Sequence, residues 1–387
     1  MLAGAFLFNL GQGVLRPTLP LYLQQVLAAN YRMVTAIPTV FGLGKWVASL
    51  PTGYLLDRLG RRPLMVSGLL VIALCDVASV ITSTYAVFLG VRALAGVGWA
   101  MFGTVATTVM VGHPAAQRRG RAVSLLLMSE TLGLLLGSAA SGWLYQGLGV
   151  ASPFVFEALC MVAAAGAVAR QPLPTTDPRL AGPRGSADRR LLWTVLRTPG
   201  VVVMGLTNAV LIAIQTGVLV FLFPLYLANR GGVGPVIVGF LVGLSLLGRL
   251  LGLGLGGTLS DRWGRLRVLI PGLVGYAAVL GTLTLLTHAG ALGLWSVAIG
   301  AAAGFVAPLP TALIADQVAP ALHGVAIGYL RTMTDGGQIV GPLVMGALAD
   351  AVDLSTPFVV AAALLIVTAW PCRRHALPAS TAGRGRS

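Results

Sequence analysis

Charged residues are scarce in this chain of 387 residues, where Asp, Glu, Lys and Arg together make up only 10%. Hydrophobic residues account for 56%, and the mean hydropathy is +0.87, far outside the usual range of soluble domains. Lysine is almost absent, since Lys45 is the only one and the other basic residues are arginine. This composition excludes an ordinary soluble protein and indicates a membrane protein.

Cysteine and histidine are equally sparse. Cys75, Cys160 and Cys372 lie far apart, and the four histidines show no ligand spacing, so neither a disulfide framework nor a metal site is expected. The chain has no P-loop for ATP, and its connections hold no constellation of an enzyme, so we expect neither enzymatic activity nor a cofactor. The net charge of +15 comes from short clusters between apolar runs, which argues against nucleic-acid binding.

Long apolar runs are what the sequence does contain. A membrane helix needs about 20 mostly apolar residues, and the N-terminus lacks the positive region and cleavage site of a signal peptide, so we interpret it as the first membrane helix. The sequence predicts an all-α membrane protein with twelve spans: 1–27, 32–55, 63–83, 85–111, 121–144, 152–169, 201–228, 235–257, 268–287, 290–314, 324–349 and 355–372.

Basic residues gather on one side of these spans. Placing alternate connections and the C-terminus on that side collects 19 of the 26 basic residues. The positive-inside rule then predicts an inner-membrane protein with both termini in the cytoplasm. We expect a bundle at 1–169, a Pro- and Arg-rich cytoplasmic linker at 170–199, a second bundle at 200–372, and a disordered tail at 373–387.

The two halves repeat each other at a constant shift of 204 residues. "LPLYL" at 19–23 meets "FPLYL" at 223–227, and "SPFV" at 152–155 meets "TPFV" at 356–359. Glycines follow the same register: Gly120, Gly133, Gly137 and Gly142 meet Gly324, Gly337, Gly341 and Gly346. The register leaves the first helix a few residues short, which suggests a trimmed or misassigned start. Two parallel six-helix repeats are typical of transporters that hold substrate near the midplane.

The motifs resemble those of the major facilitator superfamily over essentially the whole chain. "GYLLDRLGRR" at 53–62 and "GTLSDRWGRLR" at 257–267 resemble its cytoplasmic signature. "LGQGVLRPTLP" at 10–20 and "RALAGVGWA" at 92–100 resemble motifs of the 12-helix drug:proton antiporter families, although Ser138 replaces the proline of a third motif. The resemblance implies two pseudo-symmetric six-helix bundles.

The cytoplasmic signature is expected to form a conformational latch. By the resemblance, Asp57 faces the start of span 324–349 near Gly324, and Asp261 faces the start of span 121–144 near Gly120. A carboxylate at a helix N-terminus is stabilised by free amides and the dipole by about 0.3–2 kcal/mol. The expected latch residues are Gly53, Asp57, Arg58, Gly60, Arg61, Arg62, Gly257, Asp261, Arg262, Gly264 and Arg265.

Charges within the spans are candidates for coupling, because each costs several kcal/mol unless paired or hydrated. Lys45 and Arg249 each lie 12 positions before a signature aspartate, about 15–18 Å inside the membrane, and Glu130 and Asp335 lie at a similar depth. The helix packing that the resemblance implies pairs Lys45 with Asp335 and Arg249 with Glu130 across the halves. The alternatives are that Asp335 pairs only with Arg331, and that Glu130 is a static helix contact.

A second set of charges lies in the outer half of the first bundle. Asp76 and Glu157 are expected simply to neutralise Arg92 and Arg16 there, although the resemblance also makes Arg92 a proton-transfer candidate. Polar residues at helical spacing mark a cavity wall, opposite an apolar stretch around Phe305, Pro308 and Pro310. The expected cavity residues are Asn9, Gln12, Arg16, Arg92, Asn208, Gln215 and Phe305. The alternative is that the amides bond neighbouring helices.

These features predict a monomeric secondary transporter with a small-molecule substrate. A cavity with one polar wall and one apolar wall suits amphipathic molecules. The resemblance to the antiporter motifs favours export driven by the proton gradient. Transport of a polar solute such as a sugar or an organic anion is the main alternative, and dependence of affinity on Arg16 or Arg92 would favour it. A non-transporting receptor would be expected to carry a sizeable soluble domain, which the sequence lacks.

Overall fold

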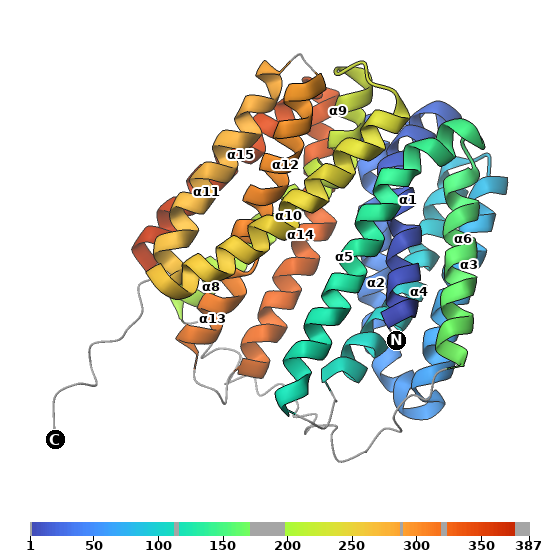
Figure 1. Cartoon of the computed structure of the whole chain (residues 1–387), viewed down its shortest axis with the longest axis horizontal. Coiled ribbons are helices and arrows are strands. Elements are labelled where there is room, and N and C mark those ends of the chain that lie inside the picture. The colour runs from blue at the N-terminus through green and yellow to red at the C-terminus, as the bar shows by residue number, and fades with distance from the viewer. Residues whose placement is uncertain (1, 112–115, 171–197, 287–288, 319–322, 376–387) are drawn as a thin grey trace.

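Twelve long helical segments run through the part of the chain that the computed structural model describes (Figure 1). The backbone is described for residues 2–111, 116–170, 198–286, 289–318 and 323–375. Within those ranges the surroundings of residues 50, 53, 57, 107–111, 116–127, 289, 323–324 and 375 are not described. Most of the expected linker and of the expected tail therefore lies outside the described residues.

The first half contributes six helices: α1 (Leu2–Leu27), α2 (Tyr31–Leu59), α3 (Arg61–Ile81), α4 (Tyr85–Val111), α5 (Ala116–Gly147) and α6 (Ser152–Ala169). The second half repeats the order, with three spans divided: α8 (Pro199–Ala213) with η2 (Ile214–Leu222) and α9 (Phe223–Asn229), α10 (Pro235–Trp263), α11 (Arg265–Thr282) with η3 (Leu283–Leu285), α12 (Ala289–Val306) with α13 (Leu309–Gln317), α14 (His323–Ala351) and α15 (Thr356–His375).

Eight of these segments are long and apolar enough to cross a membrane by length and composition, judged on the described residues. The other four are α1, α2, α5 and α14, and each carries at least one ionisable residue within its length: Arg16, Lys45, Glu130 and Asp335 are examples. Arg92, Asn208, Gln215 and Arg249, also expected at the centre of the molecule, lie on segments that meet the criterion.

Two tight turns join helices at the same repeat position. Gly60 separates α2 from α3 with a φ of 82°, and Gly264 separates α10 from α11 with a φ of 89°. Residues with a Cβ adopt such positive φ values at a steric cost, whereas glycine adopts them freely. The glycine of each signature motif therefore allows the sharp reversal. We call the end of the molecule that holds Leu2, Gly60 and Gly264 the terminal end, and the opposite end the distal end.

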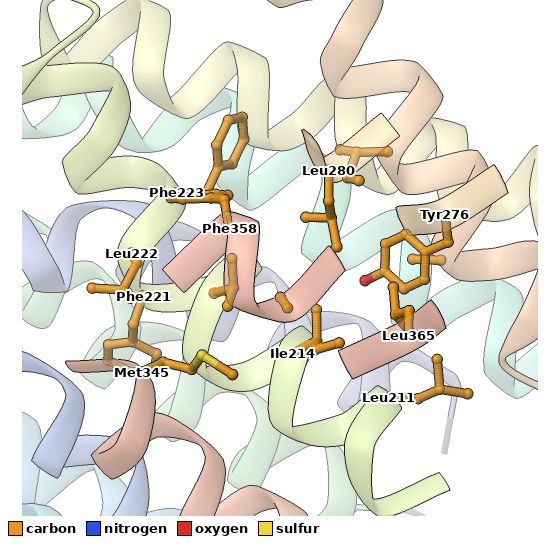
Figure 2. Close-up of a cluster of buried hydrophobic side chains, with 14 of the residues drawn as sticks. Leu211, Ile214, Phe221, Leu222, Phe223, Tyr276, Leu280, Met345, Phe358 and Leu365 are labelled. Carbon is orange, nitrogen blue, oxygen red and sulfur yellow. The ribbon is translucent and has the colours of Figure 1, made fainter. Parts of the chain in front are cut away.

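The seventh span is not a uniform α-helix. Between α8 and α9 the chain widens into the π-helical segment η2, a rare geometry that is frequent at functional sites. Ile214, Phe221 and Leu222 of this segment join a buried apolar cluster with residues of α11, α14 and α15 (Figure 2). The predicted span 290–314 is likewise divided: α12 ends at Val306, before Pro308, and α13 begins at Leu309.

The apolar core is distributed unevenly between the two ends. One cluster runs through the second half and continues into distal residues of the first half, such as Leu19, Tyr22 and Phe88. A separate cluster, with Phe8 and Leu56 among its members, lies toward the terminal end of the first half. Among the residues whose surroundings are described, the two halves therefore share a core only toward the distal end.

Small residues allow the helices to approach closely, as in other membrane bundles. A Cβ added at Gly248, Gly252 or Gly256 of α10 would lie 2.0–2.3 Å from a carbonyl oxygen of α12. The repeated motif glycines work in matching pairs. Gly133 and Gly137 contact α1 as Gly337 and Gly341 contact α8, while Gly142 contacts α10 of the opposite half as Gly346 contacts α2.

Candidate substrate cavity

A cavity of about 270 Å³ lies between the two halves. Its polar lining comes from α1, α4, η2, α10 and α14, and its apolar lining includes Phe41 of α2 and Phe221 of η2. A second cavity of about 210 Å³ adjoins it within the first half and shares Gln12 and Arg16 with it. This mixed wall fits a small molecule that has both polar and apolar parts.

Five of the expected cavity residues line these spaces. Gln12, Arg16, Arg92 and Gln215 face the cavity between the halves, and Asn9 faces the adjoining one. The lining also contains three polar residues that sequence reasoning missed, namely Thr216, Thr334 and Gln338. On α14, Thr334 directly precedes Asp335 and Gln338 follows it by about one turn, so a scan for polar residues around that aspartate would have found both.

Two expected cavity residues lie elsewhere. Asn208 is buried and donates from Nδ2 to Thr334 Oγ1 at 2.7 Å, which fits the alternative of an amide that bonds a neighbouring helix. The π-helical segment begins between Asn208 and Gln215, so seven residues no longer bring both onto one face. Phe305 lines none of these cavities, because its ring packs against Gly272 of α11 and its backbone against Gly256 of α10.

A buried polar cluster lies beside the cavity in the first half. Arg92 donates from Nη2 to Asp76 Oδ1 at 2.8 Å and to Ser79 Oγ at 2.7 Å, and its guanidinium lies 5.6 Å from the rings of Phe88 and Phe154. Asp76 is completely buried. The structure thus pairs Arg92 with Asp76, as the neutralising interpretation expected.

Glu157 of α6 belongs to the same cluster, but its hydrogen-bond partner is an amide and not an arginine. Its side chain is fully buried, and Oε1 accepts a hydrogen bond from Gln12 Nε2 at 2.5 Å. Oε2 has no hydrogen-bond partner among the described residues, although the charge of Arg16 is near enough to interact. A buried carboxylate with an open oxygen is costly when ionised, so Glu157 depends on its hydrogen bond with Gln12 and on the nearby positive charge of Arg16.

The halves are joined inside the membrane by Lys45 and Asp335. Lys45 Nζ lies 3.4 Å from Asp335 Oδ1 and 3.5 Å from Gln338 Oε1, and 4.6 Å from the ring centre of Trp99. The carboxylate of Asp335 therefore pairs across the halves, and no ion pair between Asp335 and the exposed Arg331 occurs in the described structure.

The expected pair of Arg249 and Glu130 is not formed. Glu130 lines the adjoining cavity of the first half, whereas Arg249 of α10 lines the cavity between the halves together with Arg16. The close contacts between α5 and α10 lie farther toward the distal end, where Gly239 meets Ser138 and Ser141. Depth in the membrane alone did not predict which way each side chain faces.

At the distal end the seam between α2 and α14 is closed by a carboxylate. Asp350 accepts hydrogen bonds from the backbone amides of Tyr31 and Arg32, each at 2.9 Å. These amides belong to the first turn of α2, which has no partners for them within the helix. Asn30 caps the next amide, that of Met33, at 2.8 Å. The cross-half hydrogen bonds between described residues all lie at Lys45 and Asp335 or on their distal side.

The latch expected at the terminal end is only partly described. Gly53, Asp57, Gly120 and Gly324 lie outside the residues whose surroundings are described, so the latch contacts stay a prediction. Asp261 and Arg262 are exposed, and Gly257 is half-buried with open space where a Cβ would lie. Arg58 lies over the ring of Tyr54, and Arg265 Nη1 lies 2.9 Å from Asp316 Oδ1. Arg61 and Arg62 begin α3.

Two six-helix repeats around a shared cavity define a multi-pass membrane transporter. A family model described as Major Facilitator Superfamily matches residues 1–234 and 206–385. The chain belongs to the major facilitator superfamily.

Known proteins with similar sequences and structures agree with this assignment. An uncharacterized MFS-type transporter, YcaD of Salmonella enteritidis PT4, is 26% identical over 323 residues, covering 82% of this chain and 80% of the relative. The crystal structure of the nucleoside transporter NupG superposes with a TM-score of 0.77 at 16% identity, covering 97% of this chain and 98% of that one. A bacterial homolog of the human lysosomal transporter Spinster, inward-facing and unoccupied, gives 0.72 at 14% identity, covering 97% and 94%.

Proposed function

We propose that the protein is a secondary active transporter that exports amphipathic small molecules by alternating access, driven by the proton gradient. The observation that carries this proposal is the cavity between the halves, with the hydrogen bonds from the amides of Tyr31 and Arg32 to Asp350 on its distal side. With both termini in the cytoplasm, this is an inward-facing arrangement in the inner membrane. The protein is proposed to work as a monomer.

Proton coupling rests on two groups beside this cavity. Protonation of Asp335 would remove the charge that attracts Lys45 and would loosen the seam between α2 and α14. Glu157 is buried next to Gln12 and Arg16, which line the cavity, so a change in its charge is felt where substrate binds. The latch expected at Asp57 and Asp261 would hold the terminal end together when the distal end opens.

Inverted membrane vesicles from cells without their own exporters test this proposal. Vesicles that contain the protein should accumulate amphipathic dyes in the presence of a proton gradient, and an uncoupler should abolish the accumulation. Asp335→Asn should reduce the accumulation, while Arg373→Gln, at an exposed position outside the cavity and the signature motifs, serves as the control. Accumulation that is insensitive to the uncoupler, or unchanged by Asp335→Asn, would contradict proton coupling through this seam.

A further inference from the structure

Two arginines from opposite halves face the same cavity. Arg16 of α1 and Arg249 of α10 both line the space between the halves and a smaller recess next to it. Their charges are close enough to repel each other. Among the described residues, neither guanidinium forms a hydrogen bond or an ion pair within 4 Å, and neither has nitrogen atoms sealed away from the cavity. Both arginines therefore present unused donors to whatever occupies the space.

The surrounding charges do not neutralise this pair. Arg92 already binds Asp76, and Lys45 already binds Asp335. Glu157 interacts with Arg16 at longer range, and Glu130 faces the adjoining cavity that Arg16 also lines, but neither carboxylate forms an ion pair within 4 Å of either arginine among the described residues. The phenol of Tyr276 lies near Arg249, but no hydrogen bond or ion pair joins them in the described structure. An uncompensated cation pair within the membrane is costly, so the cavity favours a negatively charged occupant.

We infer that the transported substrate carries an acidic group, a carboxylate, sulfonate or phosphonate, held between Arg16 and Arg249. This inference rests on the proposed transport function and names its substrate class. Two guanidinium forks match the oxygens of such a group. The apolar part of the molecule lies against Phe41 and Phe221 of the same cavity. Because the arginines belong to different halves, a bound anion replaces their repulsion by two attractions and draws the halves together around the substrate.

A set of naphthalene compounds of nearly equal size tests the charge preference. Naphthoate and naphthalenesulfonate are anions, naphthamide is neutral and naphthylmethylamine is a cation. Binding to the purified full-length protein in lipid nanodiscs is measured by calorimetry for wild type, Arg16→Gln, Arg249→Gln and Arg249→Lys. Arg373→Gln removes an exposed arginine outside the cavity and outside both signature motifs, and is the matched control.

The anions are expected to bind wild type at least about tenfold more tightly than the amide or the amine, and each Gln variant is expected to weaken them by about ten- to a hundredfold. Arg249→Lys keeps the charge but loses the fork, so its loss should be smaller. Size-exclusion profiles like that of wild type show that the variants are folded.

Equal binding of amide and acid, preference for the amine, or no binding of either anion to wild type would overturn the inference. Uncoupler-sensitive accumulation of neutral or cationic dyes in vesicles would then leave the proposed function intact. Loss of all gradient-driven transport would instead contradict the proposed function itself.

Discussion

The two seams between the halves are related by the repeat, yet they are built differently. The seam of α2 and α14 is polar, with Lys45 paired to Asp335 and Asp350 bound to the first amides of α2. The seam of α5 and α10 is steric, because a Cβ at Gly142 would lie 2.2 Å from the carbonyl oxygen of Pro235. Gly346 gives the α2–α14 seam an equally close contact with Thr35, so that seam adds charged contacts to close packing, whereas the α5–α10 seam relies on close packing among the described residues.

The repeat register shows why the α5–α10 seam has no counterpart of the carboxylate contact made by Asp350. Shifting by 204 residues places Gln146 at the position of Asp350 and Pro235 at the position of Tyr31. Proline has no amide hydrogen to donate, so a carboxylate at position 146 would lack one of its two partners. Among the described residues, the α2–α14 seam is therefore the one in which charged side chains join the two halves.

The largest effect is expected from adding bulk to the steric seam. Gly142→Val places atoms where the backbone of Pro235 and Val236 lies, so the distal end cannot close, at a cost of about 1–3 kcal/mol or more. Transport should be lost. Gly147→Val on the same helix is the control, because nothing lies within 4 Å of its Cβ position. Normal transport by Gly142→Val at normal expression would show that this seam does not need close contact.

A somewhat smaller effect is expected from breaking the charge pair of the polar seam. Lys45→Asp leaves two carboxylates at the seam and should shift the access equilibrium by about 1–3 kcal/mol, between the values for exposed and buried pairs. The double variant Lys45→Asp with Asp335→Lys restores opposite charges and should recover transport. Failure of the double variant to recover, with expression unchanged, would argue against a direct role of the pair.

Removing the carboxylate at the distal end should have a milder effect. Asp350→Ala leaves the amides of Tyr31 and Arg32 without their partner, which costs about 1 kcal/mol as at other helix N-termini. Spin labels at positions 148 and 352, both exposed and in different halves, should report a larger fraction of long distances. Gln146→Ala is the symmetry-matched control, and an equal shift in that variant would remove the distinction between the seams.

The smallest effect is expected from an exposed ion pair within the second half. Burial raises the pKa of Asp353, but hydrogen bonds from Arg230 and Ser355 outweigh it and hold this pKa below its ordinary value of 3.8. The pair therefore stabilises the fold above that value and loses its contribution as pH falls through the lowered pKa. Asp353→Asn should lower the free energy of unfolding by less than about 1 kcal/mol at pH 7, which is seen as a slightly lower Tm. The difference in Tm between variant and wild type should become smaller in acid. A difference that grows in acid would contradict this assignment.

The repeat made much of the fold predictable from the sequence. The constant register from residue 19 to residue 155 depends on local features, apolar runs and motif glycines, which the structure places at matching helix contacts. The pairing of Lys45 with Asp335 followed from their depth together with the helix packing that the resemblance implied. These inferences needed only the position of each residue along its helix.

The direction in which side chains face was harder to predict. Arg249 and Glu130 lie at a similar depth but face different cavities. Asn208 does not face the cavity, because the π-helical segment changes the helical spacing and no local sequence pattern predicted that segment. Asp350 was overlooked, although it lies one residue beyond the predicted span 324–349. The first amides of α2, which have no partner within that helix, lie next to it in the structure. Contacts of this kind depend on how the halves pack, which periodicity does not reveal.

Distances at the two ends of the molecule test alternating access most directly. Labels at exposed positions 148 and 352 report on the distal end, and labels at exposed positions 59 and 263 report on the terminal end. In lipid nanodiscs, Asp350→Ala removes the carboxylate that closes the distal end, so it should lengthen the distal distance and shorten the terminal one in the same molecules. Distances that stay fixed, or that change in the same direction at both ends, would contradict alternating access through these seams.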